Sequence, residues 1–193
     1  MISDKSNQIR HSLDVGNRNH FKFGDNWAQY LSVLDDTRIQ QAVLSLSTML
    51  DVKDLHGKSF CDVGSGSGLF SLAAKILGAS VISFDYDPLS VACTQELRNR
   101  YFPDDQSWVV VEGSVLDQDF LTTLGTFDIV YSWGVLHHTG QMWQALENVL
   151  LLAKDSSCLY IAIYNDQGFM SSIWKRIKKI YCTGFLGRIL IKF

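Results

Sequence analysis

The chain has 193 residues, of which 47% are hydrophobic, so it can bury one sizeable core. Its length favours a single domain with a small helical extension. The formal charge of −3 gives no electrostatic reason to expect a nucleic-acid partner. The cysteines are scattered, without a Cys-x-x-Cys pair, so neither a disulfide framework nor a metal site is expected: they are Cys61, Cys93, Cys158 and Cys182. The polar start and short apolar runs predict a cytoplasmic protein.

Residues 1–55 differ in character from the rest and are expected to form an N-terminal helical cap or lid. Two helices are predicted, Asn26–Leu34 and Asp36–Leu50. The second carries an apolar stripe made of Ile39, Val43, Leu46 and Leu50. An aromatic stretch precedes them and either closes over bound ligands or packs against the sheet edge; it contains His20, Phe21, Phe23 and Trp27.

From Ser59 onward, β-like runs alternate with helix-like stretches. The expected strands are Ser59–Val63, Ser80–Asp85, Ser107–Glu112, Phe127–Ser132 and Cys158–Tyr164. Most are nearly continuous apolar runs, which is typical of parallel strands buried on both faces. Residues 56–166 are therefore predicted to form an α/β core, a Rossmann-like doubly wound and mainly parallel sheet with helices on both faces.

Local signals mark the helices between these strands. Asp87 and Pro88 supply an N-cap and a first-turn proline for a helix that must end before Pro103. A preceding helix has Gly78 where a C-terminal glycine belongs, after an apolar stripe of Leu69, Leu72, Ala73 and Ile76. A third stripe comprises Trp143, Leu146, Val149, Leu150 and Ala153.

The strongest chemical signal is the stretch from Asp62 to Gly68, which contains Gly64, Gly66 and Gly68 at a strand end that opens a helix. Glycines let a backbone turn sharply and approach a ligand, and the helix start adds exposed N–H groups. A tight turn that binds no ligand would have the same sequence pattern. Asp85, however, stands at the end of the next strand, where an acidic side chain binds the ribose of an adenosine cofactor.

Further strand ends point to the same edge of the sheet. Gly113 and Ser114 follow the third strand, and the fourth runs out into Ser132, Trp133 and two histidines. Together, these motifs resemble those of class I S-adenosylmethionine-dependent methyltransferases over roughly Phe60 to Gly140. Within that superfamily, the chain is most similar to small-molecule methyltransferases related to the ubiquinone-biosynthesis O-methylases. A dehydrogenase is disfavoured, because nicotinamide-binding proteins prefer the spacing Gly-x-Gly-x-x-Gly.

The resemblance implies S-adenosylmethionine as cofactor and assigns roles to single residues. Asp85 would hold the ribose and Tyr86 would lie against the adenine, which Ser114 and Val115 would border. Ser132 and Trp133 would flank the sulfonium end. The methionine portion would be held by the glycine-rich stretch, through Asp62, Gly64, Ser65, Gly66 and Gly68.

The implied reaction is methyl transfer to a hydroxyl of a small molecule, in which a base helps to remove the proton. His137 and His138 follow the fourth strand, and an imidazole suits proton transfer near neutral pH. Of the two, His138 is preferred, although either ring could simply pack below the site. Two alternatives stay open: a module that binds the cofactor but is catalytically incomplete, and an RNA or protein methyltransferase.

Residues 167–193 contain no acidic residue and carry six basic ones: Lys175, Arg176, Lys178, Lys179, Arg188 and Lys192. They predict a basic amphipathic helix and tail, which either covers a sheet or makes peripheral membrane contact through residues 168–193. Methyltransferases of this class continue with an antiparallel strand hairpin that is expected to be truncated here. A partner or a second subunit, as in a homodimer, could then complete the substrate side.

Overall fold

The computed structural model describes Leu31, residues 33–165, and Gly168, Phe169, Ser171, Ile173 and Ile177. The chain divides into two compact units, Met1–Ala162 and Ile163–Phe193. The strands and helices that follow belong to the first unit. None of the helices within the described residues is both long and apolar enough to cross a membrane.

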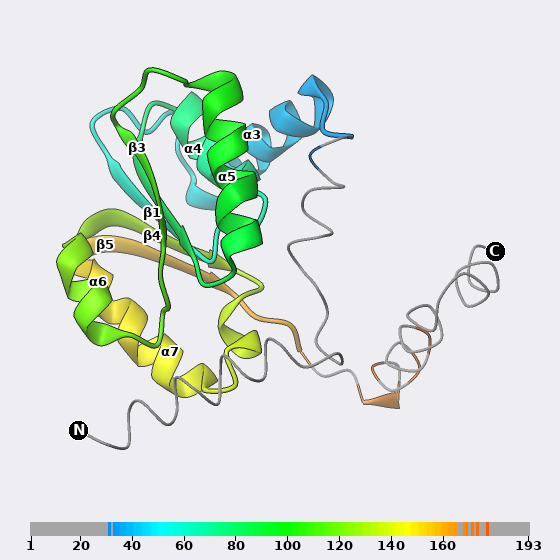
Figure 1. The fold of residues 1–193 in the computed structure, drawn as a ribbon, viewed down its shortest axis with the longest axis vertical. Helices are drawn as coiled ribbons and strands as arrows, with labels where there is room; N and C mark the ends of the chain where they lie inside the picture. Colours follow the sequence, from blue (N-terminus) through cyan, green and yellow to red (C-terminus); the bar gives the residue numbers. More distant parts are fainter. Residues whose placement is uncertain are drawn as a thin grey trace. The chain divides into compact units, whose positions relative to one another are not determined.

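A five-stranded sheet forms the centre of the first unit (Figure 1). Its strands are β1 (Ser59–Val63), β2 (Ser80–Asp85), β3 (Trp108–Glu112), β4 (Phe127–Trp133) and β5 (Ala153–Ala162). They lie in the order β3-β2-β1-β4-β5, and every neighbouring pair is parallel. The chain order reverses between β1 and β4, so the crevice at their carboxyl ends is where an open α/β sheet binds its ligand. The predicted Rossmann-like fold is confirmed.

Helices cover both faces of this sheet. On one face lie α3 (Asp36–Leu50), α4 (Leu69–Ile76) and α5 (Pro88–Tyr101), whose buried side chains share a core cluster with Phe60 and Trp108. On the other lie α6 (Gln118–Leu124) and α7 (Met142–Val149), together with the short 3-10 turns η1 (Leu136–His138) and η2 (Leu150–Leu152). Two separate apolar cores therefore hold the sheet from its two sides.

The helix signals in the sequence are confirmed for α4 and α5. The carboxylate of Asp87 accepts a hydrogen bond from the Leu89 N–H at 3.0 Å, and Pro88 opens the helix. Helix α5 ends at Tyr101, before Pro103. After α4, Gly78 has a φ of +100°, a conformation that favours glycine.

The apolar stripe predicted from Trp143 onward is wrong in part. Trp143 is 73% exposed and Leu150 is exposed as well, whereas Ala145 and Val149 are buried. The sequence pattern fails because a polar residue takes a core position. The buried Asn148 donates a hydrogen bond to the Val115 carbonyl at 3.0 Å and accepts one from Gln118 at 2.7 Å. A buried amide with several partners fills the place that periodicity would give to an aliphatic side chain.

The last strand also differs from its prediction, since β5 covers Ala153–Ala162 and not Cys158–Tyr164. Its first half is polar, and the register with β4 shifts between Phe127 and Ile129. The Ser157 hydroxyl donates to the Phe127 carbonyl at 2.5 Å, so a side chain assists the backbone pairing there. Apolar patterning alone could not locate a strand start that is held by polar contacts.

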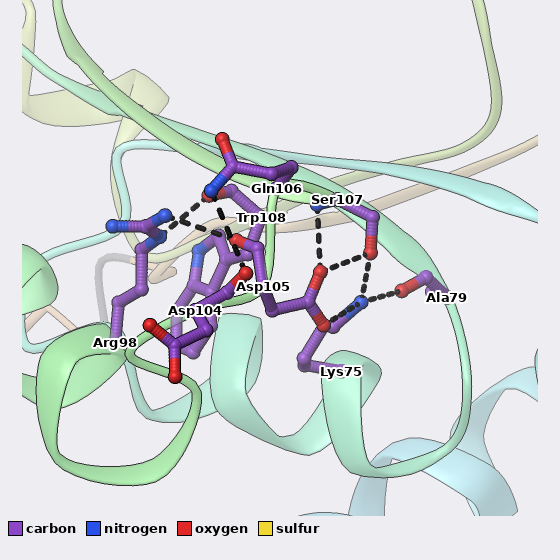
Figure 2. A network of polar contacts seen from close by, with 8 residues as sticks. All are labelled: Lys75, Ala79, Arg98, Asp104, Asp105, Gln106, Ser107 and Trp108. Atoms are coloured by element: carbon purple, nitrogen blue, oxygen red, sulfur yellow. Dashed lines mark hydrogen bonds and ion pairs between the residues drawn. The ribbon is translucent and has the colours of Figure 1, made fainter.

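A polar network ties elements together at the amino edge of the sheet, where the strands begin (Figure 2). The Lys75 ammonium, 8% exposed, lies 2.8 Å from the Asp105 carboxylate, donates to the Ala79 carbonyl at 3.1 Å and contacts the Ser107 hydroxyl. Arg98 reaches the Trp108 carbonyl at 2.7 Å and the Asp105 carbonyl at 2.9 Å. The end of α4 is thereby joined to the segment that leads into β3.

Several predictions fall outside the described residues. These are the aromatic stretch from His20 to Trp27, most of the helix predicted over Asn26–Leu34, and nearly all of the basic tail. Helix α3 contributes Ile39, Ala42 and Leu46 to the core of the first unit. That residues 1–55 act as a cap, and residues 56–166 and 167–193 as two further parts, stays a prediction.

Candidate functional site

The loop between β1 and α4 depends on glycine. Gly64, Gly66 and Gly68 all have positive φ, at +79°, +56° and +78°. A Cβ added to Gly64 would lie 2.4 Å from a methyl carbon of Val135, and one added to Gly68 would lie 2.9 Å from the Cα of Thr94. Neither backbone conformation nor space allows a side chain at these two positions. The loop therefore presents bare backbone at the carboxyl edge.

Asp85, at the end of β2, contacts this loop directly. One carboxylate oxygen accepts a hydrogen bond from the Gly66 N–H at 2.9 Å, and the other accepts from the Asp87 N–H at 2.9 Å. Burial raises the pKa of Asp85, while these N–H donors act against that rise. The glycine loop and the strand-end acid thus lie side by side, as the sequence motifs require.

Asp62, the last but one residue of β1, is the second acid at this edge and is only 3% exposed. Its carboxylate accepts a hydrogen bond from the Ser71 hydroxyl at 2.5 Å. Burial is the main cause that raises its pKa, the nearby charge of Asp85 adds to the rise, the Ser71 hydrogen bonds oppose it, and the resulting pKa is about 7. Within the described residues, no lysine or arginine forms an ion pair with either acid.

A pocket opens beside Asp85 at the ends of β1, β2 and β3. Five residues predicted to bind the cofactor line it: Gly64, Asp85, Tyr86, Ser114 and Val115. The sequence did not assign six others: Val63, Phe84, Gly113, Leu116, Val135 and Thr139. A mainly apolar pocket with one carboxylate at its rim fits a flat nucleobase joined to a ribose. Val135 and Thr139 could have been suspected only from their place near the end of β4.

The other residues predicted to bind the cofactor do not line this pocket. Asp62, Ser65, Gly66 and Gly68 lie in or beside the glycine loop, where the Ser65 hydroxyl is 2.9 Å from that of Thr94. Ser132 is fully buried, and its hydroxyl donates to the Val63 carbonyl at 3.0 Å, which ties β4 to β1. The Thr94 contact, together with its hydrogen bond to the Gly66 carbonyl at 3.3 Å, had no signal in the sequence.

Trp133 ends β4 within an aromatic group. Its ring lies nearly parallel to those of Tyr160 and Tyr131, with centroids 6.0 Å and 6.4 Å away, and Phe70 lies 6.3 Å away. Trp133 is 42% exposed, whereas Tyr131 is buried. The indole at the carboxyl edge is therefore flanked by other rings and is partly exposed.

The two predicted bases lie in η1, directly after β4. Their ring centroids are 4.0 Å apart. His137 is half-buried and His138 is exposed. Burial lowers the pKa of His137, which favours its neutral, proton-accepting form at pH 7. Neither ring lines the pocket beside Asp85.

Comparisons with known proteins agree with this geometry. A family model described as a methyltransferase domain matches residues 61–159, more than half of the chain. A mitochondrial ubiquinone biosynthesis O-methyltransferase of Schizosaccharomyces pombe is 24% identical over 81% of this chain and 58% of its own length. A ribosomal protein L11 methyltransferase of Methylococcus capsulatus is 39% identical over 36% of this chain and 24% of its own length.

The chain thus spans less than two thirds of the length of these curated relatives. Among solved structures, the magnesium protoporphyrin IX methyltransferase of Synechocystis PCC 6803 with bound SAH superposes with a TM-score of 0.56 at 17% identity. That superposition covers 90% of this chain and 74% of the other, and it shows a shared fold. With the parallel sheet, the glycine loop and the matching family model, the chain belongs to the methyltransferase domain family, the class I S-adenosylmethionine-dependent methyltransferases.

Proposed function

We propose that this protein binds S-adenosylmethionine at the carboxyl edge of its sheet and transfers the methyl group to a hydroxyl of a small molecule. The observation that carries the proposal is the 2.9 Å hydrogen bond between the Gly66 N–H and the Asp85 carboxylate. It joins the glycine loop to the strand-end acid at a pocket with apolar walls. This combination suits an uncharged nucleoside attached to a cationic amino-acid tail.

The proposed roles follow the layout of the edge. Asp85 holds the ribose hydroxyls, and Tyr86, Ser114 and Val115 border the adenine. The methionine portion lies along the glycine loop near Asp62, held by Gly64, Ser65, Gly66 and Gly68. Ser132 supports this end from below through its bond to Val63, and Trp133 covers the sulfonium side. An aromatic face beside a cationic sulfur is a favourable arrangement.

When bound, S-adenosylmethionine supplies a methyl carbon activated by positive sulfur. The chain's own task is to align the acceptor and to exclude water, and such positioning can supply much of the reduction in barrier. We propose that His138 or His137 accepts the proton of the acceptor hydroxyl. The lowered pKa of His137 keeps its imidazole neutral, and the exposure of His138 gives it access to an acceptor.

We propose a small molecule as the methyl acceptor because one relative with such a role matches most of this chain. The ubiquinone biosynthesis O-methyltransferase matches 81% of this chain, including regions outside the cofactor site. The second candidate is a protein methyltransferase, which the higher identity of the ribosomal protein L11 methyltransferase favours. That match covers only 36% of this chain, so it reports mainly on the shared cofactor region.

Isothermal titration with S-adenosylhomocysteine tests the cofactor assignment. The wild-type chain should bind it, and Asp85→Ala should reduce the affinity at least about 30-fold, because ribose hydrogen bonds to a carboxylate are lost. Ser114→Ala, at the pocket rim, is the milder matched variant. If the wild-type chain fails to bind S-adenosylhomocysteine, the proposal is wrong.

The acceptor is tested with radiolabelled S-adenosylmethionine and separated metabolite, protein and RNA fractions. Label in a small-molecule fraction supports the proposal, and label in the protein fraction supports the second candidate. Binding without any transfer would indicate a catalytically incomplete module. His138→Ala and His137→Ala, assayed in parallel, should identify the base through a fall in kcat without loss of cofactor affinity. Dimer formation and membrane contact through residues 168–193 remain predictions for separate tests.

A further inference from the structure

A chain of buried hydrogen bonds leads from the edge strand β3 to Asp62. The Trp108 indole N–H donates to the Ser83 hydroxyl at 2.9 Å, and Ser83 donates to the Ser71 hydroxyl at 2.7 Å. Ser71 in turn donates to the Asp62 carboxylate at 2.5 Å. The four residues come from β3, β2, α4 and β1, and each is at most 3% exposed. Polar groups of four different elements therefore meet within an otherwise apolar core.

The direction of this chain is fixed by chemistry. An indole N–H can only donate, so the Ser83 oxygen accepts from it. An ionised carboxylate can only accept, so the single Ser71 proton goes to Asp62 and Ser71 must accept from Ser83. The chain thus delivers a donor to one carboxylate oxygen of Asp62 and requires that oxygen to be an acceptor.

Asp62 sits where this orientation matters. It is the residue before Val63 and Gly64, both of which line the pocket. On the sheet it pairs with Ser83 of β2 and Tyr131 of β4. The charged and titratable groups that act on it are Asp85 from β2, Tyr131 from β4 and the neighbouring thiol of Cys61. None of these is a cation, so the described residues leave the charge of Asp62 uncompensated.

We propose that Trp108, Ser83 and Ser71 are positioning residues that hold Asp62 as a carboxylate acceptor for the ammonium group of the cofactor's amino-acid tail. This inference rests on the proposed function, because it assumes that S-adenosylmethionine binds at this edge. It goes further in assigning cofactor capture to three residues that do not line the pocket. The groups act through Asp62 and do not touch the cofactor.

The titration of Asp62 agrees with this arrangement. Its pKa is about 7 without ligand, so near neutral pH the group exists in both forms. Only the ionised form accepts from an ammonium group, and binding should weaken as the pH falls below 7. The Ser71 hydrogen bonds lower this pKa. Their removal should therefore move the midpoint of the binding profile to higher pH.

The test compares two probes, S-adenosylhomocysteine and 5′-methylthioadenosine, which share the nucleoside but differ in the amino-acid tail. Affinities are measured by titration calorimetry from about pH 6 to pH 9, a range that brackets the transition. For Ser71→Ala we expect about tenfold weaker binding of S-adenosylhomocysteine at pH 7 and a midpoint higher by about one pH unit. Binding of 5′-methylthioadenosine should change less than about twofold.

More distant members of the chain should have smaller effects in the same direction. Ser83→Ala and Trp108→Phe leave Ser71 in place but free its hydroxyl to turn, so about threefold weaker binding of S-adenosylhomocysteine is expected. Ser71→Thr keeps a hydroxyl and should restore most of the affinity. Ser59→Ala is the matched control, since Ser59 lies on the same strand as Asp62 but bonds Asp128 at the opposite edge. It should leave both affinities unchanged.

The outcomes separate this inference from the proposed function. If the wild-type chain binds neither probe, the proposed function fails and this inference falls with it. If the wild-type chain binds both, but Ser71→Ala weakens both equally or shifts no midpoint, the cofactor site stands and the positioning role is refuted. Circular dichroism of each variant shows whether it is folded, and Ser83→Ala replaces Ser71→Ala as the test if the latter is unfolded: a loss of affinity confined to S-adenosylhomocysteine supports the role, and equal losses for both probes, or no loss for either, contradict it.

Discussion

The aspartates at the two edges of the sheet lie in opposite electrostatic environments. At the amino edge, Asp105 lies 2.8 Å from Lys75, and Asp128 lies 2.7 Å from Lys154. Hydrogen bonds from these lysines lower the pKa of both carboxyls, to about 2 for Asp105. At the carboxyl edge, Asp62 and Asp85 are partly or fully buried, face no cation among the described residues, and have raised pKa values.

This difference separates a structural edge from a functional one. A carboxylate that is paired with lysine and serine is satisfied within the fold, and it contributes to stability at neutral pH. A buried carboxylate without a cation costs stability, and such groups gather at functional sites. The cationic tail of S-adenosylmethionine would supply at the carboxyl edge what lysine supplies at the other. Mutations at the two edges should therefore have effects of opposite sign.

The largest expected effect is at the amino edge. Lys75→Met should destabilise the protein by about 3 kcal/mol, because it leaves Asp105 and the Ala79 carbonyl without their buried donor. Urea unfolding followed by circular dichroism measures this. The exposed Lys58→Met is the control and should change stability by less than about 0.5 kcal/mol. A Lys75→Met protein of normal stability with impaired cofactor binding would reverse the roles of the two edges.

The opposite sign is expected at the carboxyl edge. Asp62→Asn should stabilise the ligand-free protein by about 2 kcal/mol at pH 8, because it removes a buried charge, and should weaken binding of S-adenosylhomocysteine. The sign follows from a folded pKa of about 7, above the ordinary value of 3.8. Stability from this group is complete below about pH 4 and is lost as the pH rises through 7.

Unfolding of both proteins at pH 5 and pH 8 measures this effect. The wild-type protein should lose stability between these values, and Asp62→Asn should lose less, because it lacks the group whose pKa is raised to about 7. Asp105, with a lowered pKa, acts only in the acid range, where its contribution is lost as the pH falls from about 4 to 2. If Asp62→Asn proves less stable than wild type at pH 8, the contrast between the edges fails.

A smaller effect is expected for a carboxylate of the functional edge that has a structural role. Asp87→Ala removes the N-cap of α5 and should cost about 1 kcal/mol. Because Asp87 also donates its N–H to Asp85, which the substitution preserves, cofactor affinity should stay within about threefold of wild type. Asp87→Asn, which retains capping ability, should recover most of the stability in thermal unfolding. If Asp87→Asn does not recover stability, the loss in Asp87→Ala does not come from the missing N-cap.

The smallest effect is expected for Lys154→Met. The Lys154 and Asp128 side chains are 42% and 25% exposed, so water screens their attraction. The loss should be about 0.5 kcal/mol, well below that for Lys75→Met. High salt should narrow the difference between wild type and Lys154→Met, whereas the contacts of the buried Lys75 ammonium should respond less. A cost equal to that of Lys75→Met would show that burial does not distinguish the two pairs.

The limits of sequence reasoning are visible in single residues. Strands β1 and β2 lie where the continuous apolar runs predicted them, because parallel strands buried on both faces leave no other pattern. The start of β5 was missed because Ser157 and Lys154 hold it through side-chain contacts. Asn148 was missed because periodicity cannot distinguish a buried amide with partners from a misplaced polar residue.

The sequence by itself determined the alternating order of strands and helices, the caps of α4 and α5, and the pairing of a glycine loop with Asp85. These features depend on local backbone preferences and on the length of one strand–helix unit. Both are determined by residues that are close together in the sequence. Only the tertiary structure decided that Thr94 and Val135 close around the glycine loop, and that Trp108, Ser83 and Ser71 line up on Asp62. These groups lie on different elements, and the packing of the sheet against its helices determines the distances between them.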